Sequence, residues 1–124
     1  MTMQARIDVE RGEEVAVARV AGEIDAANAG WAATRLRGLL TNHSHTLVVD
    51  LSATTYLDSA GIAMLFELGE AMRLHQQELR VVVPPASPIA RMVALTGLDH
   101  VISVHGTAGE ALAEAASQRP PAPA

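Results

Sequence analysis

The first third of the chain contains two stretches in which apolar and polar residues alternate. Their apolar members are Ile7, Val9, Val15, Val17 and Val20. This period of two is typical of β-strands with one buried face. The charged segment ERGEE, centred on Gly12, separates the stretches, so together they are predicted to form a β-hairpin.

A helical pattern follows the hairpin. Asp25 is predicted to be the N-cap, and the segment AANAGWAATRLRGLL continues from it. One face of this helix carries the apolar residues Ala32, Leu36, Leu39 and Leu40. Gly30 and Gly38 weaken the pattern because glycine disfavours a helix interior.

Two continuous apolar runs come next, TLVVDL at 46–51 and LRVVV at 79–83. Such runs indicate strands that are buried on both faces. Between them, a helix is predicted to begin near Ser59. Its core-facing positions follow the helical spacing and are Ile62, Leu65, Phe66, Gly69 and Met72.

The C-terminal third predicts two further helices and a strand. Ser87 and Pro88 are predicted to start a helix that stops at Gly97. Its inner face is predicted to consist of Ile89, Met92, Val93 and Thr96. A short strand is expected at 100–104. Thr107 and Glu110 then form the pattern of a capping box, and the helix after it is built on Ala111, Leu112 and Ala115.

The order of these elements predicts an α/β fold in one domain. Strands that alternate with helices indicate a mixed, mostly parallel sheet of about five strands, with an N-terminal β-hairpin and about four helices packed against it. Residues 1–116 are assigned to this domain. The segment SQRPPAPA at 117–124 is predicted to be a disordered tail.

Composition narrows the function classes. The formal charge is −5, and all nine basic residues are arginine, so nucleic-acid binding is not expected. The longest apolar runs are far shorter than a membrane span, and the polar N-terminus lacks the apolar core of a signal peptide. A soluble, cytoplasmic protein that does not bind membranes is therefore expected.

No metal site is predicted either. The chain contains no cysteine, which rules out disulfides and thiolate ligands. His43 and His45 fall in a polar loop and His75 at an exposed helix end, where solvated side chains are the expected outcome.

Ser59 is the main candidate for chemistry because it lies where a strand-like segment gives way to a helix. Ser59, with Asp58, could simply cap that helix. A second interpretation compares Leu57-Asp58-Ser59-Ala60-Gly61 with the G-x-S-x-G elbow of serine hydrolases. Leu57 replaces the first glycine of that elbow, and a base would have to come from His100 or His105.

Asp50 offers a third interpretation, because the phosphorylated aspartate of receiver domains also ends a buried strand. Those domains bind Mg²⁺ through an acidic pair after their first strand. Here the first strand leads into a hairpin, and the chain has no lysine to contact an acyl phosphate.

Two stretches resemble STAS domains, and in particular the bacterial anti-sigma-factor antagonists. They are GEID at 22–25 and VVDLSATTYLDSAGIAML at 48–65, and the resemblance extends over roughly residues 6–116. It implies that Ser59 is phosphorylated by an anti-sigma factor that is also a serine kinase. The unphosphorylated antagonist would bind that partner and release a sigma factor, and a phosphatase would reset the switch.

The resemblance also implies partner-binding residues around Ser59. Asp58, Ala60 and Gly61 occupy the motif, with Ala60 in place of the more usual serine. Glu23 and Asp25 fall in a loop that lies near the phosphorylation site in this family, although a strand end and a helix cap would explain them equally well.

Met64 and Leu68 are one turn apart on a separate flank of the helix that follows Ser59. They are predicted either to pack under a neighbouring helix or to form an exposed apolar strip beside Ser59 for a partner.

The sequence thus predicts a binding protein that is not an enzyme and needs no cofactor, since ATP and Mg²⁺ would belong to the kinase. Two alternatives remain open. One is a STAS protein of another assembly, such as a lipid-transport complex or a stress-signalling scaffold. The other is a small serine hydrolase.

Overall fold

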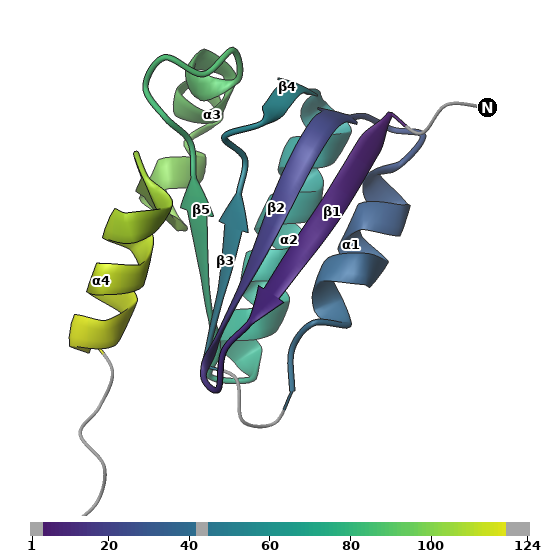
Figure 1. Ribbon diagram of the computed structural model, residues 1–124. Coiled ribbons are helices and arrows are strands. Elements are labelled where there is room, and N and C mark those ends of the chain that lie inside the picture. Colours follow the sequence, from purple (N-terminus) through teal and green to yellow (C-terminus); the bar gives the residue numbers. More distant parts are fainter. Residues whose placement is uncertain (1–3, 42–44, 119–124) are drawn as a thin grey trace, which may run out of the picture.

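The computed structural model describes residues 4–41 and 45–118, and these form an α/β sandwich around one mixed sheet (Figure 1). The strands are β1 (Ala5–Arg11), β2 (Val15–Ile24), β3 (Thr46–Asp50), β4 (Thr54–Leu57), β5 (Glu78–Val82) and β6 (Ser103–His105). The helices are α1 (Ala29–Arg37), α2 (Ser59–Leu74), α3 (Ala90–Thr96) and α4 (Ala108–Gln118). A 3₁₀ helix spans Leu98–His100.

The sheet has the order β1-β2-β3-β5-β6, and β4 pairs with β2 beyond the end of β3. Among the strands of the described residues, the β1–β2 pair is antiparallel and the other four pairs are parallel. The prediction of a mostly parallel sheet with an N-terminal hairpin and four helices is therefore confirmed.

Two apolar layers hold the helices to the sheet. The larger one joins α1 and α2 to one face, and Leu36 of α1, Leu65 of α2 and Val49 of β3 are completely buried in it. On the other face, α4 covers β3 and β5 through a small cluster that includes Val48 and Ala111. All five residues of β3 are buried, as the continuous apolar run predicted.

The short strand β4 was not predicted from the sequence. It ends directly before Asp58 and Ser59 and therefore determines where these two residues lie. Only Thr54 and Leu57 of its four residues are buried, so the segment shows no alternation. It becomes a strand because β2 is long: residues 15–19 of β2 pair with β3, and residues 22–24 pair with β4. Within the pairing of β2 with β4 the register shifts between Gly22 and Glu23, and Gly22 has a positive φ of 99°, which favours glycine.

Several predicted helix details are wrong. Asp25 is not the N-cap of α1, because the chain first makes a turn and the cap position falls at Asn28. Ser87 starts a turn before α3 rather than capping it, with its Oγ accepting a hydrogen bond from the Ile89 N–H, which lies at the cap position. On α3, Met92 and Thr96 are exposed, because this short helix buries only Val93.

The C-terminal predictions were partly correct. Residues 98–100 form the 3₁₀ helix, so the last strand begins at Ser103 instead of residue 100. Thr107 Oγ1 accepts a hydrogen bond from the Glu110 N–H at 3.1 Å, as a capping box requires. The Glu110 carboxylate instead accepts from the Gly106 N–H. Leu112 is 38% exposed, and α4 packs on the sheet through Ala108 and Ala111 instead.

The predicted tail at 117–124 falls mostly outside the described residues, and α4 extends two residues into it, to Gln118. None of the helices in the described part of the chain has the length and apolar character needed to cross a bilayer.

Candidate functional site around Ser59

The predicted site residues converge at the carboxyl ends of β2 and β4. The parallel pairing of Ile24 with Leu57 ends both strands at the same level. Asp25 directly follows β2, and Asp58 directly follows β4. Both residues therefore leave the sheet at the same edge, which is the upper one in Figure 1. Ligand and partner sites of open α/β sheets commonly lie at this end.

Asp58 is the N-cap of α2. Its backbone is extended, with φ −95° and ψ −172°, and its Oδ1 accepts hydrogen bonds from the N–H groups of Ala60 at 2.9 Å and Gly61 at 3.1 Å. A carboxylate here also balances the positive end of the helix dipole.

Ser59 is consequently not needed as a cap. It is the first residue of α2, it is exposed, and among the described residues no hydrogen bond to its hydroxyl is found. The helix-cap interpretation of Ser59 is therefore wrong, and its hydroxyl is presented to solvent at a helix N-terminus.

The loop between β2 and α1 is closed by its own side chains and lies against Asp58. The Asn28 side chain donates to the Glu23 carbonyl at 2.8 Å and accepts from the Asp25 N–H at 2.9 Å. Asp58 Oδ2 accepts from the Ala26 N–H at 3.3 Å. Glu23 is exposed and Asp25 is half-buried, so both residues contribute to the surface at this end of the sheet.

Gly61 and Ala60 contribute to packing rather than to an open surface. A Cβ atom on buried Gly61 would overlap Leu57 Cδ1 and lie 3.1 Å from Ile24 Cγ2. Ala60 is half-buried and packs against the main core. The close approach of α2 to β2 and β4 requires a residue without a side chain at Gly61, and its contact with a partner stays a prediction.

The exposed apolar strip predicted at Met64 and Leu68 does not exist. Met64 is 7% exposed and Leu68 is 1% exposed, and both belong to the main core. As a partner-binding surface this prediction is wrong, because α1 packs beside α2 and covers that flank. The alternative interpretation, that both pack under a neighbouring helix, is confirmed.

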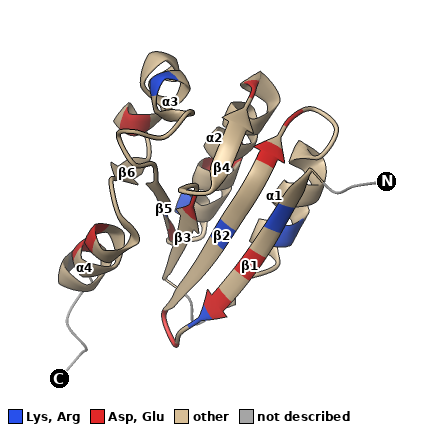
Figure 2. Cartoon of the chain, turned by 45° about the horizontal axis from the view of Figure 1, so that its top comes forward, with Lys and Arg blue, Asp and Glu red and all other residues tan. Residues whose placement is uncertain are grey.

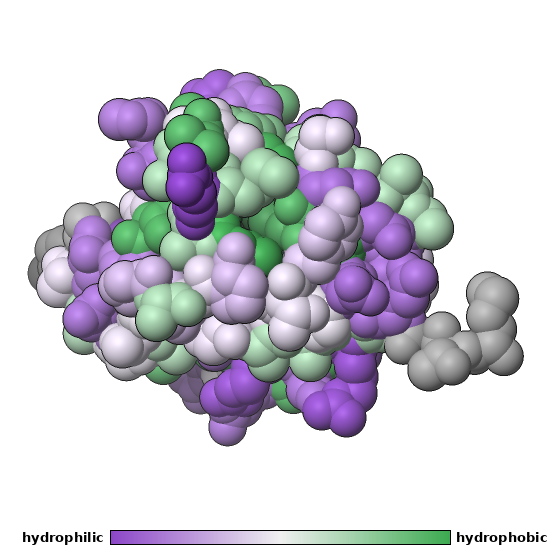
Figure 3. Space-filling view, turned by 90° about the horizontal axis from the view of Figure 1, so that it is seen from above, coloured by the Kyte–Doolittle hydropathy of each residue, from purple (hydrophilic) through white to green (hydrophobic). Residues whose placement is uncertain are grey.

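The same end of the molecule offers a different apolar surface. Helix α3 lies at the same end of the molecule as β4 (Figure 1). This helix exposes the apolar side chains of Met92 and Leu95. Seen from above, apolar surface occupies a hollow near the centre of this face and is framed by hydrophilic residues (Figure 3). Figure 2 shows acidic residues at the tips of β2 and β4, where Glu23, Asp25 and Asp58 lie.

The histidines give no support to a metal or hydrolase site. His45 and His75 are exposed, and His43 lies outside the described residues. No group of three metal-binding side chains is found in residues 4–41 and 45–118. The His105 ring lies beside Arg80, and within those same ranges neither His105 nor His100 forms a hydrogen bond with Ser59.

The receiver-domain interpretation of Asp50 also lacks support. This carboxylate is 9% exposed, and its Oδ1 accepts hydrogen bonds from both the N–H and the hydroxyl of Ser52. It is thus engaged in the turn after β3.

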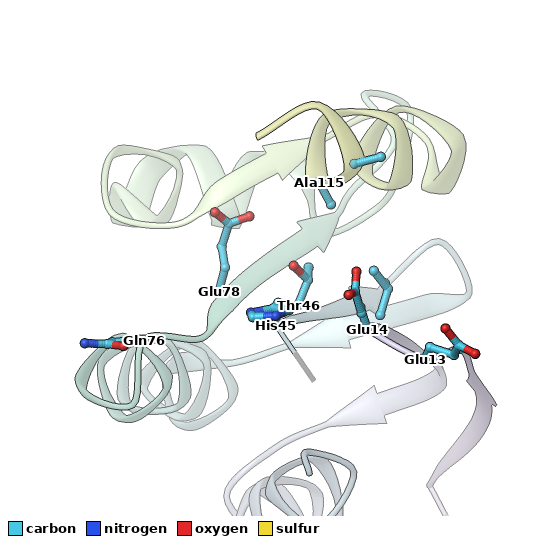
Figure 4. Close-up of a pocket in the computed structure, with 10 residues that line it drawn as sticks. Glu13, Glu14, His45, Thr46, Gln76, Glu78 and Ala115 are labelled. Atoms are coloured by element: carbon cyan, nitrogen blue, oxygen red, sulfur yellow. The ribbon is translucent and has the colours of Figure 1, made fainter. Parts of the chain in front are cut away.

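A cavity of about 720 Å³ lies at the opposite end of the sheet (Figure 4). Glu14 from the hairpin turn, Thr46 and Glu78 from the starts of β3 and β5, and Ala115 from α4 line it. Because it opens at the amino ends of the parallel strands, it is not part of the site at Ser59.

Known proteins resemble the chain over most of its length. The family model described as "STAS domain" matches residues 6–111. The anti-sigma-B factor antagonist of Listeria monocytogenes is 31% identical over 91 residues, which cover 73% of this chain and 79% of that protein. The anti-sigma-F factor antagonist RsfB of Mycobacterium tuberculosis is 32% identical over 98 residues, or 79% of each chain.

A solved structure agrees with these matches. The crystal structure of an anti-sigma factor antagonist from Mycobacterium paratuberculosis superposes with a TM-score of 0.78 at 31% identity. The match covers 89% of this chain and 92% of that one. The fold, the motif around Ser59 and these similarities together establish that the chain belongs to the STAS domain family.

Proposed function

We propose that this protein is an anti-sigma-factor antagonist controlled by phosphorylation of Ser59. In its unphosphorylated form it binds an anti-sigma factor that is also a serine kinase, and so releases a sigma factor in the cytoplasm. The exposed Ser59 hydroxyl at the start of α2, left free by the Asp58 cap, is the observation that carries the proposal. The names of the relatives support the general function.

The protein acts as the substrate of the kinase, not as an enzyme. The Ser59 oxygen attacks the γ-phosphorus of ATP, the bond from that phosphorus to ADP breaks, and the hydroxyl proton passes to a base of the kinase. ATP and Mg²⁺ are bound by the kinase, so this chain needs no cofactor. A phosphatase returns phosphoserine to serine by hydrolysis.

The fold should tolerate the phosphate. Phosphoserine carries about −1.5 to −2 charges and three acceptor oxygens. At a helix N-terminus an anion is favoured, by about 0.3–1 kcal/mol at exposed positions. The domain is therefore expected to stay folded after modification.

The complex should not tolerate it. A kinase holds the remaining phosphates of its nucleotide opposite the hydroxyl that it has modified, and this surface already carries three carboxylates. Each pair of like charges about 5 Å apart costs roughly 3 kcal/mol at an effective dielectric constant near 20. One such pair lowers affinity about 100-fold, which exceeds the gain at the helix end.

The apolar surface of this face supplies a reason for the unphosphorylated form to bind. Met92 and Leu95 on α3 are exposed at the end of the molecule that carries Ser59. Exposed apolar groups framed by polar residues are typical of protein interaction sites. We therefore propose that the apolar part of the interface is formed by Met92 and Leu95 on α3, because Met64 and Leu68 are buried.

Phosphate transfer is the direct test. The purified protein is incubated with ATP, Mg²⁺ and the anti-sigma-factor kinases of the same genome, and intact mass is measured. One phosphate is expected on the wild type and on Ser103→Ala, whose serine is exposed on β6 at the far edge of the sheet. Ser59→Ala should receive none, and a phosphate that persists in this variant would disprove the assignment.

Binding is tested separately with a Ser59→Asp variant. It should unfold at the same temperature as the wild type but bind the anti-sigma factor about 100-fold more weakly, while Ser59→Ala binds normally. Equal affinities for the aspartate variant and the wild type would refute the switch. Ester hydrolysis that Ser59→Ala abolishes would instead identify a hydrolase.

A further inference from the structure

The two oxygens of the Asp58 carboxylate hold two different parts of the chain. Oδ1 accepts from the N–H groups of Ala60 and Gly61 in the first turn of α2. Oδ2 accepts from the Ala26 N–H, 32 residues earlier, in the loop between β2 and α1. One side chain therefore caps the helix of Ser59 and also fastens that loop.

The loop is internally rigid but has few links to α2. Asn28 ties its ends through the Glu23 carbonyl and the Asp25 N–H, and Asp25 Oδ1 accepts from the Ala27 N–H. A backbone hydrogen bond from the Asp58 N–H to the Ile24 carbonyl lies at its base. The bond to Ala26 is the link through which Asp58 holds the body of the loop.

We propose that Asp58 is a positioning residue that couples the charge state of Ser59 to the loop at 25–28. The physiological trigger rests on the proposed phosphorylation of Ser59. A phosphate on Ser59 brings three acceptor oxygens to the N–H groups that Asp58 now caps. It also places a dianion beside the Asp58 carboxylate, which is repelled and releases Ala26.

This coupling gives phosphorylation a second consequence. Asp25, the acidic residue of this loop, donates its N–H to Asn28 and directly precedes Ala26, whose N–H Asp58 binds. Once Ala26 is released, the Asp25 carboxylate loses its fixed position relative to α2. The surface that a partner meets is then altered in shape as well as in charge.

An Asp58→Asn variant separates the two functions of this side chain. Asparagine caps helices about as well as aspartate, so its oxygen can still accept from Ala60 and Gly61. Its NH₂ group replaces the second oxygen, and two donors then face each other at Ala26. The variant should imitate the phosphorylated loop while Ser59 remains unmodified.

Amide NMR of the intact protein provides the measurement. Three proteins are compared with the wild type: Asp58→Asn, Ser59→Ala, and a protein with phosphoserine installed at position 59 during translation, which requires no kinase. In Asp58→Asn and in the phosphoserine protein, the Ala26 amide should move upfield and exchange with solvent roughly tenfold faster, because a charge-assisted hydrogen bond is lost.

The other amides provide the internal control. In Asp58→Asn, the Ala60 and Gly61 amides should remain protected from solvent exchange, because the asparagine oxygen still accepts their hydrogen bonds, and Ser59→Ala should leave the Ala26 amide unchanged. An unchanged Ala26 amide in the phosphoserine protein overturns the coupling. If the Ala60, Gly61 and Ala26 amides all lose protection to the same extent in Asp58→Asn, Asp58 is only a helix cap and the proposal is also wrong.

These outcomes are independent of the proposed function. A lack of kinase transfer to Ser59 would refute the proposed function, while the NMR comparison would still decide whether Asp58 couples the two segments. Conversely, a working binding switch with an unaltered Ala26 amide would refute the coupling alone.

Discussion

Arg80 on β5 and Glu114 on α4 form an ion pair beneath α4, with 3.2 Å between Arg80 Nη1 and Glu114 Oε1. The Arg80 side chain is 0% exposed and also pairs with Glu78 on its own strand. His105 Nε2 lies 3.0 Å from Arg80 Nη1. Because guanidinium groups only donate, Nε2 must accept here, and the ring proton lies on Nδ1, toward Glu114.

This ion pair should contribute to the stability of the domain. α4 offers mainly alanine side chains to the sheet, so its apolar burial is modest. Glu114→Gln should lower the free energy of unfolding by about 1–3 kcal/mol, because a buried cation loses one counter-charge. Urea denaturation measures this, with Glu67→Gln on the exposed face of α2 as a matched control that should change little. Equal midpoints for the two variants would contradict the expectation.

Gly61 and Gly30 should respond oppositely to alanine. Gly61→Ala places a methyl group against Leu57 and Ile24, so we expect a loss of about 1–3 kcal/mol in unfolding free energy. Gly30 is an exposed residue of α1, and nothing lies within 4 Å of a Cβ added there. Gly30→Ala should therefore stabilise the protein by about 0.5–1 kcal/mol, because alanine favours helix. Thermal unfolding tests both, and destabilisation by Gly30→Ala would show that the end of α1 is constrained in some other way.

Leu68 and Leu95 provide a test of which apolar residues are core. Leu68→Ala should cost about 2–5 kcal/mol, since Leu68 is 1% exposed in the main core. Leu95 is 74% exposed on α3, so Leu95→Ala should leave stability within about 0.5 kcal/mol of the wild type. If α3 forms part of the proposed interface, Leu95→Ala should nevertheless weaken binding of the anti-sigma factor, which calorimetric titration can measure.

The ion pair of Glu70 and Arg73 should change the pKa of Glu70 but contribute little to the free energy of unfolding. The hydrogen bond from Arg73, and then its charge, lower the pKa of Glu70, while the pKa of Arg73 is raised by the same contacts. A carboxyl group whose pKa is lower in the folded than in the unfolded state stabilises the fold at pH values above its unfolded-state pKa. This stabilisation is lost as the pH falls through the folded-state pKa. Because both side chains are exposed at the surface of α2, little stability is expected from the pair.

The measurement for this pair is a carboxyl NMR titration. Arg73→Ala should raise the pKa of Glu70 toward its ordinary value, and the urea midpoint at neutral pH should stay close to that of the wild type. A Glu70 titration that does not move in Arg73→Ala would show that another group sets its pKa.

Elements with a strong local pattern could be predicted from the sequence. The apolar runs at 46–51 and 79–83 became β3 and β5, and the helical spacing after Ser59 became α2. Errors occurred where few residues are buried. β4 has four residues and is too short to show a periodic pattern. α3 buries only Val93, so the apolar character of Met92 did not predict that this residue is exposed.

The candidate site was predicted as a motif but not as an arrangement. The pattern from Asp58 to Gly61 located the start of α2, and only the family resemblance implied that Glu23 and Asp25 lie near it, since the residues themselves indicated a strand end and a helix cap. Their proximity depends on the pairing of β2 with β4, which joins residues more than 30 positions apart. Asn28, which closes the loop, was missed, although an asparagine just before a helix is a known capping signal.

By itself, the sequence determined the order and kind of most elements and the position of the serine at the head of α2. These follow from local periodicity and from the preferences of Asp, Ser and Gly at helix ends, which act over a few residues. The tertiary structure decided that Met64 and Leu68 are core, that Arg80 is buried under α4 and that Asp58 reaches Ala26. Burial and long-range hydrogen bonds depend on which distant segment covers a given face, and local spacing does not specify that segment.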